Sequence, residues 1–156
     1  LGNYALGASY IALPWWAGQA LFGHLTWTTA LLTLAYSLSG LGIAVINDFK
    51  SVEGDRSLGL ESLPVVFGIK NASRISAGMI DIFQLAMVVV LIAIGQHFAS
   101  VILVLLIIPQ ITFQDIWLLR DPLTFDVKYQ ASAQPFLILG MLVTAIAIGH
   151  SPLISL

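Results

Sequence analysis

The residues best suited to chemistry in this chain lie together in the segment 47–56, with the sequence NDFKSVEGDR. Three carboxylates, a lysine and an arginine fall within it, although only 9% of the chain is charged. Hard cations such as Mg²⁺ take carboxylate and phosphate oxygens together. The oxygen ligands available for a metal are Asp48, Asp55, Glu53 and Asn47. The cations available for phosphate oxygens are Lys50 and Arg56. The spacing allows two interpretations, a cation–diphosphate site or a solvated loop.

The composition is that of a membrane protein. The mean hydropathy is +0.95, and 58% of the residues are hydrophobic. Soluble domains are about 25% charged, far above the value found here. The chain has no cysteine, which excludes disulfides and thiolate metal sites, and its net charge of −2 gives no indication of a nucleic-acid partner. It begins with Leu and shows no signal peptide, so we expect it to be part of a longer protein.

Five apolar segments each have about the 20 residues that a helix needs to cross a bilayer. The expected spans are 4–22, 26–46, 75–95, 98–119 and 133–149. Short turns at 23–25 and 96–97 predict two helical hairpins, whereas the connections 47–74 and 120–132 are longer and polar. Pro14 and Pro109 are expected to kink their helices. The predicted fold is an all-α, polytopic transmembrane bundle.

The five-span count places every basic residue on the membrane face that carries the connections 47–74 and 120–132, called here the charged face. These residues are Lys50, Arg56, Lys70, Arg74, Arg120 and Lys128. The positive-inside rule makes this face cytoplasmic, or stromal in a plastid. His24, His97 and His150 are then expected on the opposite face, away from the acids.

Several polar residues are expected inside the helices near the charged face: Asp81, Gln84, Gln110, Gln114 and Asp115. An ionisable side chain facing lipid is costly, so the two acids should face the bundle interior or a wet cavity. The predicted arrangement is a polar pocket open to the charged face above an apolar lower half. Such a pocket suits an amphipathic substrate whose charged head lies among the acids and whose hydrocarbon lies between helices.

The segment 47–65 resembles the second aspartate-rich motif of the UbiA superfamily of membrane prenyltransferases. The stretches 108–115 (IPQITFQD) and 126–136 (DVKYQASAQPF) fit the same family, as do 1–7 and 13–18. The resemblance covers essentially the whole chain. It is greatest for the branch that esterifies chlorophyllide, and the bacteriochlorophyllide branch shares much of the pattern.

The resemblance implies nine transmembrane helices, of which this chain would supply the last five, and Mg²⁺ ions that bridge two aspartate-rich motifs to an allylic diphosphate. The implied reaction transfers a geranylgeranyl or phytyl group to the propionate of chlorophyllide in the thylakoid membrane. Small light-harvesting-like chlorophyll-binding proteins are implied as partners. The implied catalytic residues are Asp48, Asp55, Lys50 and Arg56. The candidates for substrate binding are Lys128, Tyr129, Gln114 and Asp115.

Two departures from the family pattern limit the prediction. The first aspartate-rich motif is absent upstream of residue 47, so these residues alone are expected to be inactive. Many relatives carry an aspartate where this chain has Ser51, which leaves the roles of Asp48 and Asp55 open. Alternatives are another UbiA-type prenyltransferase, a pigment-holding subunit of a photosynthetic assembly, or a transporter. A transporter would need an ionisable path through the bilayer, and the apolar half supplies none.

Overall fold

A computed structural model describes the backbone of residues 2–151 and the side chains of residues 5–151. Within this part all regular structure is helical and no strand occurs, which confirms the all-α prediction. The chain forms two compact units, Leu1–Phe83 and Gln84–Leu156. Each unit contains one group of the candidate site residues.

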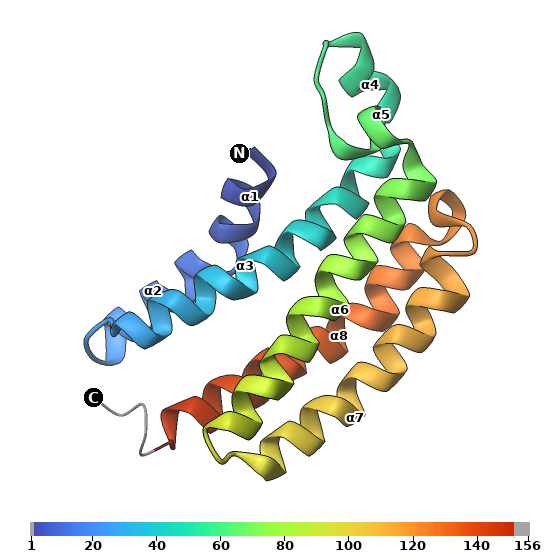
Figure 1. Cartoon of the computed structure of the whole chain (residues 1–156). Coiled ribbons are helices and arrows are strands. Elements are labelled where there is room, and N and C mark those ends of the chain that lie inside the picture. Colours follow the sequence, from blue (N-terminus) through green and yellow to red (C-terminus); the bar gives the residue numbers. More distant parts are fainter. Residues whose placement is uncertain (1, 152–156) are drawn as a thin grey trace. The chain divides into compact units, whose positions relative to one another are not determined.

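The first unit contains five α-helices, a short 3₁₀-helix and the beginning of a sixth α-helix (Figure 1). Its elements are α1 (Gly2–Tyr10), α2 (Ala12–Phe22), α3 (Trp27–Asn47), η1 (Asp48–Lys50), α4 (Val52–Ser57), α5 (Leu63–Phe67) and the first part of α6 (Ile69–Ala93). The second unit contains the remainder of α6, then α7 (His97–Phe113), a π-helical turn η2 (Gln114–Leu118) and α8 (Pro122–Gly149).

In the part of the chain that the structure describes, four helical segments are long and apolar enough to cross a membrane: Trp27–Lys50, Ile69–Ala93, His97–Leu118 and Pro122–Gly149. The expected first span, 4–22, is not one continuous helix, because α1 and α2 are separated at Ile11. Pro14 explains the break, since it has no N–H for the carbonyl of Tyr10 and its ring crowds that carbonyl. The next hydrogen bond, from the Trp15 N–H to the Ile11 carbonyl, is long at 3.4 Å.

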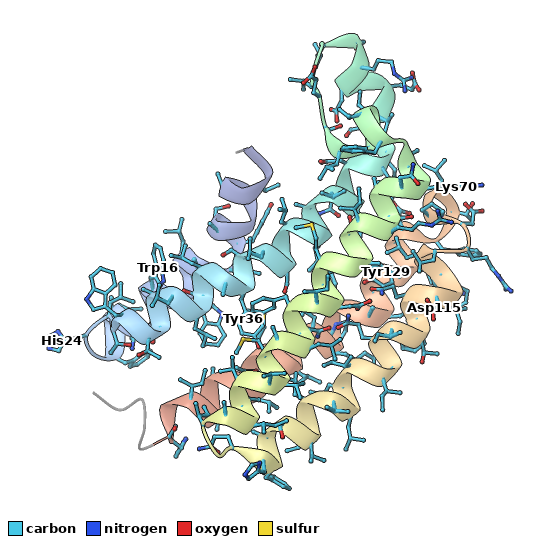
Figure 2. The ribbon with its side chains drawn as sticks, in the orientation of Figure 1. Trp16, His24, Tyr36, Lys70, Asp115 and Tyr129 are labelled. Carbon is cyan, nitrogen blue, oxygen red and sulfur yellow. The ribbon has the colours of Figure 1, made fainter. Side chains whose placement is uncertain are left out.

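Glycines allow α1 and α3 to approach closely within the first unit. A Cβ atom added at Gly7 would lie 2.6 Å from the backbone oxygen of Ser37, so only glycine fits there without movement of a helix. Across α2 and α3, the indole N–H of Trp16 donates to the hydroxyl of Thr33 over 2.8 Å (Figure 2). These contacts hold both short helices against α3.

The end of α3 and the beginning of α6 also pack together within the first unit. A Cβ atom added at Gly42 would lie 2.9 Å from the backbone oxygen of Ser76 and 2.9 Å from the Ile80 side chain. Further along, the rings of Tyr36 and Phe83 meet edge to face, with centroids 4.8 Å apart. This packing holds the two helices from which the segment 48–68 projects (Figure 1).

The prediction of a polar loop at 120–132 is wrong, because α8 begins at Pro122. Asp121 caps the helix by accepting a hydrogen bond from the Thr124 N–H, and proline at the first helical position is already in the required φ range. Lys128 and Tyr129 therefore lie on a helix rather than in a loop. Likewise α6 begins at Ile69, directly after Gly68 with φ of +76°, and not at residue 75.

Helices α7 and α8 pack against each other in the second unit. A Cβ atom added at Gly140 of α8 would lie 2.9 Å from Cδ1 of Leu103 of α7, so this glycine allows close packing. Towards its end α7 widens into η2, where the Leu119 N–H donates to the Gln114 carbonyl five residues back over 2.9 Å. π-helical turns are rare in proteins, and those that occur often lie at functional sites.

Candidate functional site

The acidic segment is helical rather than an open loop, and two apolar side chains anchor it. Phe49 and Val52 are buried, at 2% and 7% exposure, while Lys50 and Glu53 point to solvent. The 3₁₀-turn η1 continues α3 and leads into α4, so the polar side chains follow helical spacing. Burial of the two apolar residues therefore determines which side of the segment carries the polar groups.

Ser51 links the two aspartates that the sequence singled out. Its hydroxyl lies 3.0 Å from the backbone oxygen of Asp48 and 3.3 Å from Oδ2 of Asp55, and it can donate to either. Residues three and four apart lie on the same face of a helix. Asp48, Ser51 and Asp55 therefore share one face, which we call the aspartate face.

Glu53 and Arg56 form an ion pair with each other, 2.8 Å from Nη1 to Oε1. Both side chains are largely exposed, and exposed ion pairs contribute only about 0–1 kcal/mol. Arg56 could therefore exchange Glu53 for a phosphate group at little cost. Glu53 lies beside the aspartate face, not on it.

The donors on the aspartate face fit part of a Mg²⁺ site. Carboxylate and hydroxyl oxygens are suitable ligands, and Mg²⁺ usually binds one or two carboxylates together with substrate phosphates and water. Among the described residues, however, no group of three His, Cys, Asp or Glu side chains could hold a metal by itself. The segment therefore supplies part of a coordination shell that a phosphate group would help to complete.

Gln114 and Tyr129 meet inside the second unit. The Tyr129 hydroxyl donates to Oε1 of Gln114 over 3.2 Å, and both side chains are about 2% exposed. Gln114 begins the π-helical turn, and Tyr129 lies two turns into α8. This hydrogen bond connects η2, at the end of α7, to α8.

Lys128 lies against two aromatic rings of the same unit. Its ammonium nitrogen is 3.7 Å from the centre of the Trp117 ring and 5.8 Å from that of Phe125. The electron-rich faces of aromatic rings attract cations, by about 0.5–1 kcal/mol at exposed sites. The two rings hold the Lys128 ammonium group in a defined position, although the side chain remains exposed to solvent.

Asp115 differs from its neighbour Gln114, because its side chain is exposed and does not face the interior of the unit (Figure 2). Of the two surroundings expected for this acid, the interior is therefore excluded within this unit, and a wet cavity stays a prediction. Gln114 is buried because it lies one turn after the buried Gln110 on the same helical face, whereas Asp115, the next residue, points away from that face. The histidines at 24, 97 and 150 are exposed, and the His150 ring contacts the Ile146 carbonyl of its own helix.

Three features escaped the sequence reasoning. Ser51 was singled out only as a departure, although its spacing from Asp48 and Asp55 already indicates a shared helical face. The role of Trp117 beside Lys128 depends on the early start of α8. Two buried glutamines, Gln84 and Gln110, have no hydrogen-bond partner for either amide atom. The sequence places Gln110 within an apolar helix, but only the tertiary structure shows that its amide is buried and unpaired.

Comparison with known proteins gives the same family for most of the chain. The model of the UbiA prenyltransferase family matches residues 1–128. Chloroplastic chlorophyll synthase from Arabidopsis thaliana is 63% identical over 150 residues, which cover 96% of this chain and 39% of that protein. The corresponding protein of Oryza sativa subsp. japonica is 59% identical, over 96% of this chain and 40% of its own length.

A more distant relative is the bacteriochlorophyll synthase 34 kDa chain of Chloroflexus aurantiacus. It is 34% identical over 95% of this chain and 47% of its own length. No solved structure matches the chain. The chain spans about two fifths of the length of the plant relatives. With the helical membrane fold and the aspartate face in place, these similarities show that the chain belongs to the UbiA prenyltransferase family.

Proposed function

We propose that this chain is the C-terminal part of a chlorophyll synthase, which esterifies the propionate of chlorophyllide with geranylgeranyl or phytyl diphosphate. The aspartate face carries this proposal, because it presents Asp48 and Asp55 together at the end of a membrane helix. Identities of 59–63% to the plant enzymes, against 34% to a bacteriochlorophyll synthase chain, favour chlorophyllide as the acceptor.

The proposed metal ligands are Asp48 and Asp55, with Asn47 and Glu53 as further oxygen donors at the edge of the aspartate face. A bound Mg²⁺ would neutralise charge on the diphosphate as it leaves. Glu53 would first have to release Arg56, which then becomes available for a phosphate oxygen. Lys50 is the second cation proposed for the diphosphate.

In this reaction the carbon–oxygen bond between the prenyl group and the diphosphate breaks. A carboxylate oxygen of the propionate forms the new bond to the same carbon, and diphosphate leaves with the electron pair. The residues around the aspartate face contribute by holding the leaving group in one orientation. Apolar surroundings would keep water from competing with the carboxylate for the reacting carbon.

The four candidates of the second unit are proposed for the acceptor. Lys128 keeps its charge exposed while two rings hold it, so it is suited to a carboxylate. Tyr129 and Gln114 orient each other by their hydrogen bond and would offer neutral polar contacts. Asp115 is exposed at the π-helical turn and would offer a negatively charged contact.

Location and assembly follow from the same proposal. The plant relatives are chloroplastic by name, which supports the thylakoid membrane, with the aspartate face on the stromal side. Small light-harvesting-like chlorophyll-binding proteins are proposed partners. The first aspartate-rich motif is proposed to lie outside these 156 residues, since the plant relatives are much longer. The 156 residues by themselves would then be inactive.

The function is tested in the full-length protein by replacing Asp48 or Asp55 with Asn. Each change should lower esterification of chlorophyllide at least 100-fold without loss of membrane insertion, because the neutral amide weakens the metal–diphosphate contact. Ester formation is measured by chromatography of the pigments. Glu61→Gln is the matched control, since Glu61 is an exposed acid of the same segment and should be dispensable. Normal turnover in both Asp variants would exclude the proposal.

A further inference from the structure

Two glutamines are buried in the second unit with their amides entirely unpaired. Gln84 of α6 and Gln110 of α7 are each about 1% exposed. Among the described residues, neither the nitrogen nor the oxygen of either amide has a hydrogen-bond partner. Most buried polar groups in proteins are paired, so each exception requires an explanation. Polar side chains within membrane helices are costly and are usually functional.

The register of α7 against α8 shows which residues of α8 lie opposite these amides. Gln114 of η2 accepts a hydrogen bond from Tyr129 of α8, and the Leu103 side chain of α7 packs against Gly140 of α8. Leu103 precedes Gln114 by eleven residues, and Gly140 follows Tyr129 by eleven residues. The two helices are therefore antiparallel and keep the same pairing of residues between these two contacts. Four residues back from Gln114 is Gln110, and it therefore lies level with Ala133.

Both amides thus lie opposite small residues of α8. Ala133 is buried on the face of α8 that packs on α7. The amide nitrogen of Gln84 is 4.0 Å from the position that a Cβ atom of Gly140 would occupy. Ala133 and Gly140 are seven residues apart, two turns along the same face, about 10 Å by helical rise. Ala133 and Gly140 have no polar side-chain atom that could pair with the amides, so a group from outside the unit would have to supply the partner.

The chemistry of the amides limits what that group can be. An amide offers a donor and an acceptor without charge, so it does not balance a diphosphate or a carboxylate. A prenyl chain has no polar atom and would leave the amides as unsatisfied as before. A large, mostly apolar molecule with neutral oxygen atoms would satisfy their N–H groups. The ring system of a chlorophyllide, with its carbonyl substituents, has this character.

We propose that Gln84 and Gln110 bind carbonyl oxygens on the acceptor ring and so select the acceptor rather than the prenyl donor. This inference rests on the proposed function. It concerns residues outside the aspartate face and different from the four acceptor candidates named above, although Gln110 lies one helical turn from Gln114. It assigns the two glutamines a role in specificity, in direct contact with the ring.

The test uses the full-length protein in nanodiscs with Gln84→Leu and Gln110→Leu. Leucine has a similar size and no polar atoms, so thermal stability should be unchanged or higher. The KM for chlorophyllide should rise at least fivefold in each variant, whereas the KM for phytyl diphosphate should stay within twofold. Gln→Met at the same positions should reproduce the result if a Leu variant fails to insert.

Gln134→Leu is the matched control, because Gln134 of α8 donates to Gln130 at 3.4 Å and is already paired. Its KM for chlorophyllide should not change. An unchanged acceptor KM in both buried variants, or an equal rise in both KM values, would overturn the inference in favour of a purely structural role. A wild-type protein that neither binds chlorophyllide by fluorescence nor esterifies it would instead refute the proposed function.

A chlorophyllide analogue whose ring keto group is reduced provides a second measurement. Wild-type protein should bind the analogue more weakly than chlorophyllide, and at least one Leu variant should bind the two equally well. If the glutamine and the keto group do not interact, the effects of removing each on the binding free energy should add. A Leu variant that no longer distinguishes the two ligands therefore identifies a direct contact. Equal discrimination by the wild type and both variants would contradict the proposed contact.

Discussion

The hydroxyl of Ser51 lies between the two aspartates that are proposed to bind the metal. It can donate to the backbone of Asp48 or to the carboxylate of Asp55, so it orients the aspartate face without adding charge. A neutral oxygen at this position makes the face less attractive to a divalent cation than a third carboxylate would. Metal affinity at this site should therefore be adjustable at residue 51.

Replacement of Ser51 by Asp should strengthen metal binding. The new carboxylate would join the aspartate face, and its charge would attract Mg²⁺ more strongly than a hydroxyl does. In the full-length protein, the Mg²⁺ concentration that gives half-maximal esterification should fall severalfold. Ser57→Asp adds the same charge to exposed α4 outside the aspartate face and should change this concentration little. A higher Mg²⁺ requirement for Ser51→Asp would contradict the assigned geometry.

At the scale of the elements, glycine positions determine which helices approach closely. Gly7 and Gly18 both lie in short N-terminal helices and look alike in the sequence. A Cβ atom at Gly7 would collide with the α3 backbone, whereas one at Gly18 would meet nothing within 4 Å. Packing, rather than helix propensity, therefore requires glycine at the first of these positions.

The two glycines give a paired prediction for stability. Gly7→Ala should destabilise the protein by about 1–3 kcal/mol, because the added methyl group pushes α1 away from α3. Gly18→Ala should be neutral or stabilising by up to about 1 kcal/mol, because alanine favours the helix. Thermal unfolding in detergent measures both. Equal effects of the two changes would show that α1 does not pack on α3 as described.

Element boundaries could be predicted where the local signal is strong. The apolar stretch 26–46 became α3 with a shift of one residue at each end, since length and hydropathy suffice there. The start of α8 was misplaced by eleven residues, from the expected 133 to Pro122. Its first turns carry charges at Asp126 and Lys128 that were interpreted as a loop. The helix starts there because Asp121 caps it and Pro122 occupies its first position, and packing then buries Asp126 and holds Lys128 against aromatic rings.

At the scale of the whole molecule, the charge distribution predicts a definite topology in the membrane. Ser57 and Arg120 belong to segments of the predicted charged face, and His24 and His97 belong to the two opposite hairpin turns. All four side chains are exposed, and the chain contains no cysteine that would react instead. Single cysteines at these positions would therefore report sidedness directly.

A membrane-impermeant thiol reagent applied to sealed vesicles should label Ser57→Cys and Arg120→Cys from one side only. It should label His24→Cys and His97→Cys from the other side only. Other cysteines of the full-length protein are removed first, and labelling after detergent treatment shows that each thiol can react. Labelling of Ser57→Cys and Arg120→Cys from opposite sides would refute the predicted topology.

The sequence by itself determined the membrane class, the helical fold and the family, because hydropathy and a local motif depend only on residue types and short spacings. It also singled out Asp48 and Asp55 as a pair. Only the tertiary structure decided that Gln114 is buried while Asp115 is exposed, and that the amides of Gln84 and Gln110 are unpaired among the described residues. Those outcomes depend on contacts between helices distant in the chain, and such contacts leave no fixed spacing in the sequence.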